Sequence, residues 1–373
     1  MSKKVIAAGH ICLDITPVFP GEKVERIGDV LNPGKLIYMN EADVHTGGSV
    51  ANTGLAMKIL GADVSLVSKI GKDAFGHIVL NILKDYHAEE GMIVVDGDST
   101  SYSVVLAVPG VDRIFLHNPG ANDTFVMEDI PEETLKDVSL FHFGYPPLMK
   151  RMYEDKGSEL VRLMKTMKDR GIATSMDMTS VDPNSPAGKA DWKAILEGVL
   201  PYVDFFVPSV EELCYMLDSA RYEEWQERAV GKDITEVLDL EKDIKPLADK
   251  CMVMGAKVLL IKCGAPGIYY RTAGTEALQQ VGAGIELNVV DWAEKEGFEK
   301  SYVPEKILSG TGAGDTSIAA FLTSVLEGYS LEECMQLATA TGACCVAAYD
   351  ALSGLKPLCE LQEKIAAGWR KNP

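Results

Sequence analysis

The feature of this sequence that most constrains its fold is the alternation of short apolar runs with longer amphipathic stretches. Runs of strand length lie at residues 5–13, 64–70, 139–143, 172–176, 203–207 and 258–261. Helical patterns lie at residues 49–60, from Asp73 onward, and at 153–169, 313–326 and 331–348. This alternation is typical of a largely parallel sheet covered by helices. We expect Ser49 to cap the first helix and Gly61 to end it.

Two segments break this rhythm and favour a second, smaller sheet. Residues 15–46 and 98–118 contain alternating patterns, at 35–39 and 102–106, separated by Gly, Pro and Asp. Such patterns favour an antiparallel sheet. We therefore expect an α/β core made of residues 1–14, 47–97 and 119–373, and a β-sheet lid made of residues 15–46 and 98–118. The charged stretch 219–248 predicts a surface insertion of helix and loop, with a disordered loop as the alternative.

Charge and composition exclude several kinds of partner. The chain has 36 Lys and Arg residues against 55 Asp and Glu, a formal net charge of −19. Because such a surface repels polyphosphate backbones and anionic lipid heads, we expect neither nucleic acid nor membrane as a partner. The uncharged stretch 334–349 is too short and too polar to span a bilayer and predicts a buried helix. The eight cysteines form no CxxC pair, which favours reduced thiols in a cytoplasmic protein.

The glycine-rich segment 309–315, Ser-Gly-Thr-Gly-Ala-Gly-Asp, predicts an anion site. It opens a helix, where bare backbone N–H groups and the helix dipole attract a phosphate. It lacks the Gly-Lys-Ser/Thr ending of a P-loop, and Asp315 replaces the last glycine of a dinucleotide fingerprint. An acid beside an anion hole is explained if it takes a proton from a substrate hydroxyl. The plainer alternative is a flexible turn with Asp315 in the first helical turn, where acids are favoured.

Polar residues nearer the N-terminus are candidates for the other half of a site. The segment 47–52, Gly-Gly-Ser-Val-Ala-Asn, is also a glycine turn that opens a helix, and Asn52 either caps it locally or reaches a polyhydroxylated ligand. Asp14 and Asp177 each follow an apolar run, at the strand ends where α/β sheets bind ligands. Both also suit a simple strand-end turn, which we favour for Asp177. The six histidines lack metal-ligand spacing and are expected to be structural or exposed.

Taken in order, the two glycine segments resemble the signatures of the ribokinase-like, or PfkB, carbohydrate kinases. Residues 47–52, 60–62 and 70–76 match the first signature, and residues 312–315 with the helix behind them match the second. The resemblance covers nearly the whole chain. It implies a ribokinase-like, three-layer α/β core with a mostly parallel central sheet flanked by helices, plus a small β-sheet lid. It also implies ATP and Mg²⁺ as cofactors and a small-molecule sugar as acceptor.

The same resemblance implies roles for single residues. Asp315 would be the catalytic base, beside an anion hole formed by the backbone of Gly312, Ala313 and Gly314. The acceptor would be bound by Asp14, Gly47, Gly48 and Asn52. The nucleotide would lie along Gly264, Gly267 and Thr311. Glu212 would support magnesium through water.

Several positions depart from the family pattern. Ser209 stands where the Asn-x-x-Glu motif has Asn, and Ser309 and Gly310 stand where the second signature begins Asp-Thr. These departures put magnesium handling and monovalent-cation binding in doubt. Thr339 replaces a common Asn of the nucleotide pocket. The segments 219–248 and 284–301 have no counterpart in the pattern.

The resemblance leaves three functional hypotheses. We expect an ATP-dependent kinase that phosphorylates a hydroxymethyl group of a sugar or related small molecule. A nucleoside kinase of the same fold is the near alternative, since Phe19, Tyr38 and Phe115 offer aromatic surface for a base. A non-catalytic sugar or nucleotide sensor is the second alternative. A homodimer formed through the lid is expected, because its sheet would expose apolar residues and strand edges.

Overall fold

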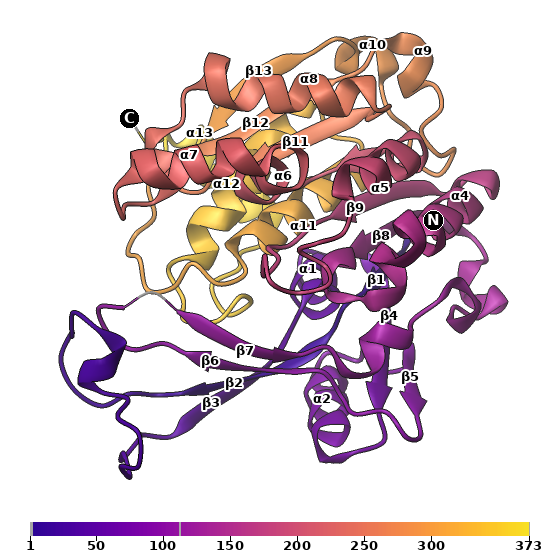
Figure 1. Cartoon of the computed structure of the whole chain (residues 1–373). Helices are drawn as coiled ribbons and strands as arrows, with labels where there is room; N and C mark the ends of the chain where they lie inside the picture. The colour runs from indigo at the N-terminus through magenta and orange to yellow at the C-terminus, as the bar shows by residue number, and fades with distance from the viewer. Residues whose placement is uncertain (1–2, 112, 373) are drawn as a thin grey trace.

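The computed structural model describes residues 3–111 and 113–372 and contains one large and one small sheet (Figure 1). The large sheet has nine strands in the order β13-β12-β11-β10-β9-β8-β1-β4-β5. Neighbours from β11 to β5 pair in parallel, and β12 and β13 extend this sheet in antiparallel fashion. Its strands are β1 (Lys4–Gly9), β4 (Asp63–Gly71), β5 (Met92–Val95), β8 (Val138–Gly144), β9 (Ala173–Asp177), β10 (Phe205–Phe206), β11 (Val258–Lys262), β12 (Gly267–Thr272) and β13 (Glu296–Lys300).

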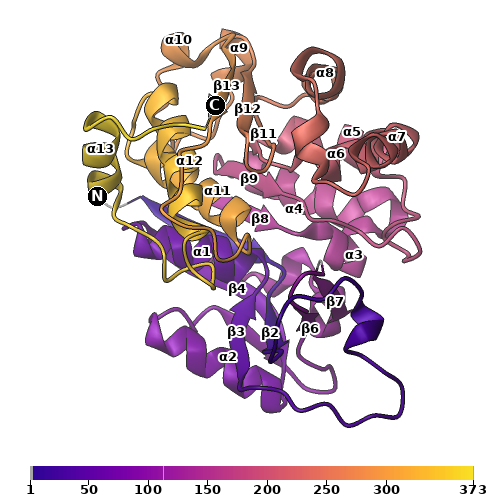
Figure 2. The ribbon, with the colours of Figure 1, turned by 90° about the vertical axis from the view of Figure 1, so that its left-hand side faces the viewer.

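Helices cover both faces of the large sheet, which gives three layers (Figure 2). One face packs against α1 (Ser49–Ile59), α2 (Ala74–Asp85), α9 (Thr275–Leu278), α10 (Val289–Trp292), α11 (Ala313–Leu326), α12 (Leu331–Cys345) and α13 (Leu358–Ala366). The other packs against α3 (Lys150–Tyr153), α4 (Ser158–Asp169), α5 (Trp192–Val199), α6 (Val210–Leu217), α7 (Ser219–Ala229) and α8 (Lys245–Val253). The predicted α/β class is confirmed.

The first strand shows why the sheet is buried on both faces. Val5 and Ala7 of β1 belong to one apolar core, whereas Ile6 and Ala8 belong to the other. Successive side chains of a strand point to opposite faces, so a continuous apolar run must be covered on both sides. The expected runs at 64–70, 139–143, 172–176 and 258–261 form β4, β8, β9 and β11 in the same way.

The small sheet, which we call the lid, lies at one end of the molecule (Figure 1). Its order is β3-β2-β6-β7, with strands β2 (Cys12–Pro17), β3 (Ala42–Gly47), β6 (Tyr102–Leu106) and β7 (Ile114–Asn118). The outer pairs are antiparallel, but the central pair of β2 and β6 is parallel. The expectation of a purely antiparallel sheet was therefore wrong. Residues 35–39, expected as a strand, form none, and Leu36 and Tyr38 are exposed there.

The expected strand at 5–13 was also wrong, because it is two strands in two sheets. β1 ends at Gly9, whose φ of +124° suits glycine, and a Cβ there would lie 2.3 Å from the carbonyl oxygen of Gly144. The chain then turns, and the amide of Leu13 bonds to the carbonyl of Ser101 at 2.9 Å. Asp14 therefore lies within β2 of the lid and does not follow a core strand. The expected boundary after residue 14 falls inside β2, and the division into core and lid remains a prediction.

Two expected helix details differ. The helix expected at 153–169 is interrupted, because Asp155 and Lys156 adopt left-handed backbone conformations before α4 begins. Ser49 is not the cap of α1, since Gly48 holds that position without a side-chain hydrogen bond. The Ser49 hydroxyl instead lies 3.2 Å from Nε2 of His142. Gly61 follows the helix with φ +105°, as expected of a left-handed C-terminal residue.

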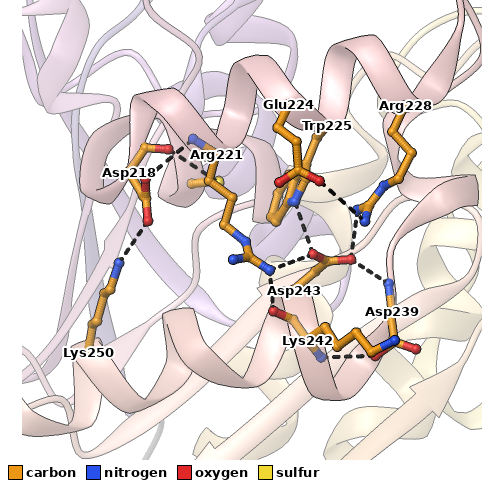
Figure 3. A network of polar contacts seen from close by, with 10 residues as sticks. Asp218, Arg221, Glu224, Trp225, Arg228, Asp239, Lys242, Asp243 and Lys250 are labelled. Carbon is orange, nitrogen blue, oxygen red and sulfur yellow. Dashed lines mark hydrogen bonds and ion pairs between the residues drawn. The ribbon is translucent and has the colours of Figure 1, made fainter.

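The stretch 219–248 forms α7, a turn at Ile234–Val237, a π-helical turn at Leu240–Ile244 and the start of α8. Trp225 is fully buried and belongs to the core on its face of the sheet. The carboxylate of Asp243 is buried too and accepts hydrogen bonds from Arg221, Arg228 and the indole of Trp225 (Figure 3). The charged residues of this insertion thus help to hold a packed structure together. The weak apolar periodicity of the segment did not predict this packing.

Two global expectations can be compared with the described residues. All eight cysteines are free thiols. Within residues 3–111 and 113–372, no helix combines the length and apolar character needed to cross a bilayer.

Candidate active site

The candidate site is built around the N-terminus of α11. Gly312 precedes this helix with φ +75°, and a Cβ there would lie 2.3 Å from Cβ of Ala351. No side chain of residues 3–111 and 113–372 caps the helix at this position. Because the first N–H groups of a helix lack intrahelical partners, the turn at Gly312, Ala313 and Gly314 offers donors to an anion.

Asp315 lies in this first turn with 4% of its surface exposed. Its carboxylate accepts hydrogen bonds from Nδ2 of Asn52 at 3.0 Å and from Oγ1 of Thr53 at 3.3 Å. The hydroxyl of Tyr145 lies 2.8 Å from Oδ1 and 2.9 Å from Oδ2. Helices α1 and α11 and the loop after β8 therefore converge on one carboxylate. Burial and the nearby carboxylates of Asp315 and Asp177 raise the pKa of Tyr145 well above its usual value, so its hydroxyl remains a donor.

Asp14 lies in the lid beside the first glycine turn. A Cβ on Gly47 would come within 2.1 Å of Oδ2 of Asp14, so any larger residue there would displace the carboxylate. Burial raises the pKa of Asp14, against the opposing effect of hydrogen bonds from Cys12 and Ser103. The amide of Asn52 bonds to the carbonyl of Gly48 at 2.9 Å. Asp14, Gly47, Gly48 and Asn52 thus form a continuous group that reaches Asp315.

Two histidines lie next to this group, although sequence reasoning assigned them no site. His10 is buried, and a Cβ on Gly48 would lie 2.6 Å from its Nδ1. The rings of His10 and His117 are 5.1 Å apart, and Oγ of Ser103 lies 3.0 Å from Nδ1 of His117. Burial lowers the pKa of both rings. Nδ1 of His10 and Nε2 of His117 are buried without a hydrogen-bond partner among the described residues.

Asp177 and Lys262 form a buried ion pair next to the first turn of α11. Nζ of Lys262 lies 2.7 Å from Oδ1 of Asp177, whose side chain is fully buried. Oδ2 of Asp177 has no hydrogen-bond partner among the described residues. Burial, and secondarily the charges of Glu212 and Asp315, raise the pKa of Asp177, while the adjacent ammonium group of Lys262 opposes this and favours the ionised carboxylate. Asp177 is therefore more than the strand-end turn residue that we favoured.

The expected nucleotide residues lie in two loops near this pair. Gly264 follows β11 with φ +63°, and a Cβ there would lie 2.9 Å from Oγ1 of Thr235 in the 219–248 insertion. Gly267 opens β12, and its contact with the carbonyl of Glu299 leaves no room for a side chain. Thr311 accepts a hydrogen bond from the lid residue Arg113. These contacts give each position a structural role and neither support nor oppose a nucleotide role.

The departures from the family pattern have local explanations. Ser209 and Glu212 form a capping box at the start of α6, in which the Ser209 amide lies 2.8 Å from Oε2 of Glu212. The hydroxyl of Ser309 accepts the Thr311 amide at 3.1 Å. Thr339 donates to carbonyls of its own helix, at 3.2 Å from Met335 and 3.1 Å from Gln336. Among the described residues, no group of three or more His, Cys, Asp or Glu side chains is arranged to hold a metal by itself.

Sequence reasoning named most of the acidic and glycine positions but missed their neighbours. Thr53, Tyr145 and Lys262 carried no motif signal of their own. A signal was present for Lys262, because a lysine at the carboxyl end of a buried parallel strand lies where such sheets bind ligands. Tyr145 lies directly after β8, at the start of an irregular turn that no pattern in the sequence reveals.

Comparison with known proteins agrees with this architecture. A family model described as pfkB family carbohydrate kinase matches residues 8–357. The chain is 24% identical to fructokinase-2 of Oryza sativa subsp. japonica, over 97% of this chain and 94% of that one. It is 23% identical to an uncharacterized sugar kinase of Archaeoglobus fulgidus, over 81% of this chain and 98% of that one.

Solved structures share the fold at lower identity. The ribokinase of Arabidopsis thaliana complexed with ribose and ATP superimposes with a TM-score of 0.69 at 20% identity, covering 97% of this chain and 98% of that one. Fructokinase of Xylella fastidiosa with bound ATP gives a TM-score of 0.70 at 17% identity, covering 98% and 99%. Fold and family match together define the class of this protein as a carbohydrate kinase. The chain belongs to the pfkB carbohydrate kinase family.

Proposed function

We propose that this protein is an ATP-dependent kinase that transfers the γ-phosphoryl group to a hydroxymethyl group of a sugar or related small molecule, with Asp315 as catalytic base. The observation that carries the proposal is the position of Asp315, buried at a helix N-terminus and hydrogen-bonded to Asn52. That position lies between the polar group around Asp14 and the first amides of α11 at Gly312 to Gly314, of which the Ala313 amide makes a long hydrogen bond of 3.4 Å to the carbonyl of Gly310. A proton acceptor and an anion site thus adjoin each other.

The mechanism follows from these positions. Asp14 and Asn52 orient the acceptor, and Asp315 takes the proton of its hydroxyl as that oxygen bonds to the γ-phosphorus and ADP departs. The amides of Gly312, Ala313 and Gly314 stabilise the negative charge on the transferred group. The lid excludes water, which would otherwise compete with the acceptor.

Magnesium, bound with the nucleotide, would supply charge neutralisation on the phosphates. The side chains of Asp177 and Glu212 fit the part of that role that a protein supplies, which is to support the ion. Oδ2 of Asp177 is a buried oxygen without a hydrogen-bond partner in the described part of the chain, and the charge of Glu212 acts on Asp177. Mg²⁺ commonly uses one or two carboxylates with water and phosphate, so these two side chains are sufficient as protein ligands or water-mediated supports.

A sugar is favoured over a nucleoside by the polar character of the side chains around Asp14. Asp14, His10, His117 and Ser103 present polar groups suited to hydroxyls. Of the aromatic residues considered for a base, Phe19 is buried and Tyr38 lies on an exposed loop. A nucleoside acceptor remains the alternative within the class, and a non-catalytic sensor remains the alternative outside it.

We further propose a homodimer that forms through the lid. Edge strand β7 exposes Phe115 and Leu116, at 55% and 53% of their surface, and the loop before β3 exposes Leu36 and Tyr38. Pairing with a second copy would cover these apolar groups and the strand edge. A cytoplasmic location, in keeping with eight free thiols, also stays a prediction.

A panel of acceptors tests the function. Purified protein is incubated with Mg²⁺ and ATP plus single pentoses, hexoses, adenosine or inosine, and ADP release is measured. We expect release that depends on one sugar or a closely related compound. Turnover of nucleosides alone would refute the sugar assignment. Stabilisation by a sugar with a nonhydrolysable ATP analogue, but no ADP release with any acceptor, would favour the sensor.

A further inference from the structure

Lys262 is the last residue of β11, and its side chain lies inside the candidate site. The side chain is 14% exposed. A Cβ placed on Gly314 would lie 3.4 Å from its Cδ and 3.6 Å from its Nζ. The ammonium group therefore lies beside the first turn of α11, where the anion hole is formed. A Cβ at Gly314 would be in ordinary van der Waals contact with this lysine, so the two groups are direct neighbours.

The backbone around Lys262 explains its direction. Its amide bonds to the carbonyl of Pro208 at 2.9 Å, and Lys262 and Ser209 form an isolated parallel bridge. Lys262 is thus the direct backbone neighbour of the position where the Asn-x-x-Glu motif has asparagine and this chain has serine. The long cationic side chain of Lys262 therefore starts beside Ser209, where the family motif has the side-chain amide of an asparagine.

The electrostatic surroundings of Lys262 combine two effects that oppose its positive charge with three carboxylates that favour it. The N-terminus of a helix carries partial positive charge, which repels an ammonium group. Burial also opposes the charge, yet the carboxylates of Asp177, Glu212 and Asp315 outweigh it and raise the pKa of Lys262. The lysine therefore stays protonated, with Asp177 as its nearest counter-ion. A helix N-terminus and a lysine that converge on one point together favour a phosphate there.

We propose that Lys262 is a catalytic residue that binds the transferred phosphoryl group, exchanging its ion pair with Asp177 for the phosphate when the nucleotide binds. This inference rests on the proposed kinase function. The exchange removes the ammonium group from Oδ1 of Asp177, which keeps its hydrogen bond from the Met178 amide, and leaves the carboxylate available to the magnesium side of the site. It also gives this chain a cation in place of the hydrogen-bonding amide that Ser209 cannot supply.

The test compares Lys262→Met and Lys262→Arg with Lys165→Met, whose lysine is about half exposed on α4. Steady-state kinetics are measured with the acceptor found in the panel. We expect Lys262→Met to lower kcat by roughly 10²- to 10³-fold, as for removal of another transition-state donor, with little change in KM for the acceptor. Lys262→Arg should recover part of the loss, and Lys165→Met should match the wild type. A folded Lys262→Met with kcat within about threefold of the wild type would overturn the proposal.

A binding measurement separates this inference from the kinase assignment. Calorimetry with a nonhydrolysable ATP analogue and with AMP, on wild type and Lys262→Met, needs no turnover. We expect the variant to lose affinity for the triphosphate but not for AMP. Equal losses for both, or none, would refute the phosphate contact even in an active kinase. A selective loss in a protein that phosphorylates nothing would retain the contact and reject the kinase.

If Lys262→Met does not fold, the same binding comparison is made on Lys262→Met/Asp177→Asn. Removing both members of a buried pair avoids leaving one charge unpaired. The double variant should also show a smaller preference for the triphosphate over AMP, and an unchanged preference would overturn the proposal.

Discussion

The hydroxyl of Tyr145 lies 2.8 and 2.9 Å from the two carboxylate oxygens of Asp315. Tyr145 follows β8 in the left-handed region, with φ 65° and ψ 45°, a costly conformation for a residue with a side chain. Just before it, a Cβ on Gly144 would lie 1.8 Å from Oγ of Ser49, so the chain is tightly held. A strained turn therefore places one phenol on the proposed catalytic base.

From this contact we predict that Tyr145→Phe lowers kcat by roughly tenfold, because a hydrogen bond to a charged group contributes about 1.5–3 kcal/mol. The orientation of Asp315 should relax while the ring keeps its packing. Steady-state kinetics with the identified acceptor measure the loss. Tyr215→Phe is the matched control, since that hydroxyl bonds to the carbonyl of Gly188, away from Asp315. Equal kinetics for both variants would refute the orienting role.

A second prediction concerns the insertion 219–248 (Figure 3). Asp243 is fully buried between Arg221, at 2.8 Å, and Arg228, at 2.7 Å. Breaking a buried ion pair leaves unpaired charge, so Asp243→Ala should lower the free energy of unfolding by about 3–5 kcal/mol. Glu224→Gln is the control, because this exposed residue pairs with Arg228 at 3.8 Å and should cost under about 1 kcal/mol. Urea denaturation measures both, and similar losses would contradict the account.

Much of the fold follows from the sequence alone. Continuous apolar strands must be covered on both faces, and few architectures achieve this. The run at 64–70 could only be a buried strand, and the pattern at 313–326 gives α11 with its bounds. The sequence did not predict the edge strand β13 (Glu296–Lys300), because it is half polar and pairs with a neighbour on one side only. Its identity depends on β12, a long-range neighbour that no local pattern reveals.

The candidate site was predictable only where a motif carried it. Asp315 and Asn52 lie in glycine signatures, and they hydrogen-bond each other as a shared site requires. The site role of Asp14 remains a prediction, and its expected placement at the end of a core strand was wrong, because the turn at Gly9 depends on contact with Gly144. Tyr145 reaches the site through tertiary packing that single-sequence patterns do not contain, whereas the place of Lys262 at the end of a buried strand could have indicated it.

A third prediction uses the buried His142. Burial, and secondarily the charge of Lys262, lower its pKa to about 3. An unfolded histidine binds a proton near pH 6.5, so unfolding takes up a proton between these two values and stability falls as the pH falls. At pH 5 this histidine alone should cost about 2 kcal/mol relative to pH 8. Denaturation of wild type and His142→Gln between pH 5 and pH 8 gives the free energy of unfolding of each protein. The same pH dependence of this free energy in both proteins would exclude the effect.

A fourth prediction concerns assembly. Phe115→Ser/Leu116→Ser should convert a dimer into a monomer, because both side chains are exposed on edge strand β7. Sedimentation velocity measures the change. Ile78→Ser, an exposed apolar residue on α2, is the control and should leave the dimer intact. A wild-type protein that remains monomeric at high concentration would refute assembly through the lid.

The most direct test of the central claim is acceptor-dependent ADP release by Asp315→Asn. Asparagine fills the same space but cannot take a proton. We predict that kcat falls by roughly 10²- to 10⁴-fold, the range expected for loss of a general base, while acceptor and nucleotide still raise the melting temperature. Undiminished turnover by a folded Asp315→Asn would show that this carboxylate is not the base and would contradict the proposed mechanism.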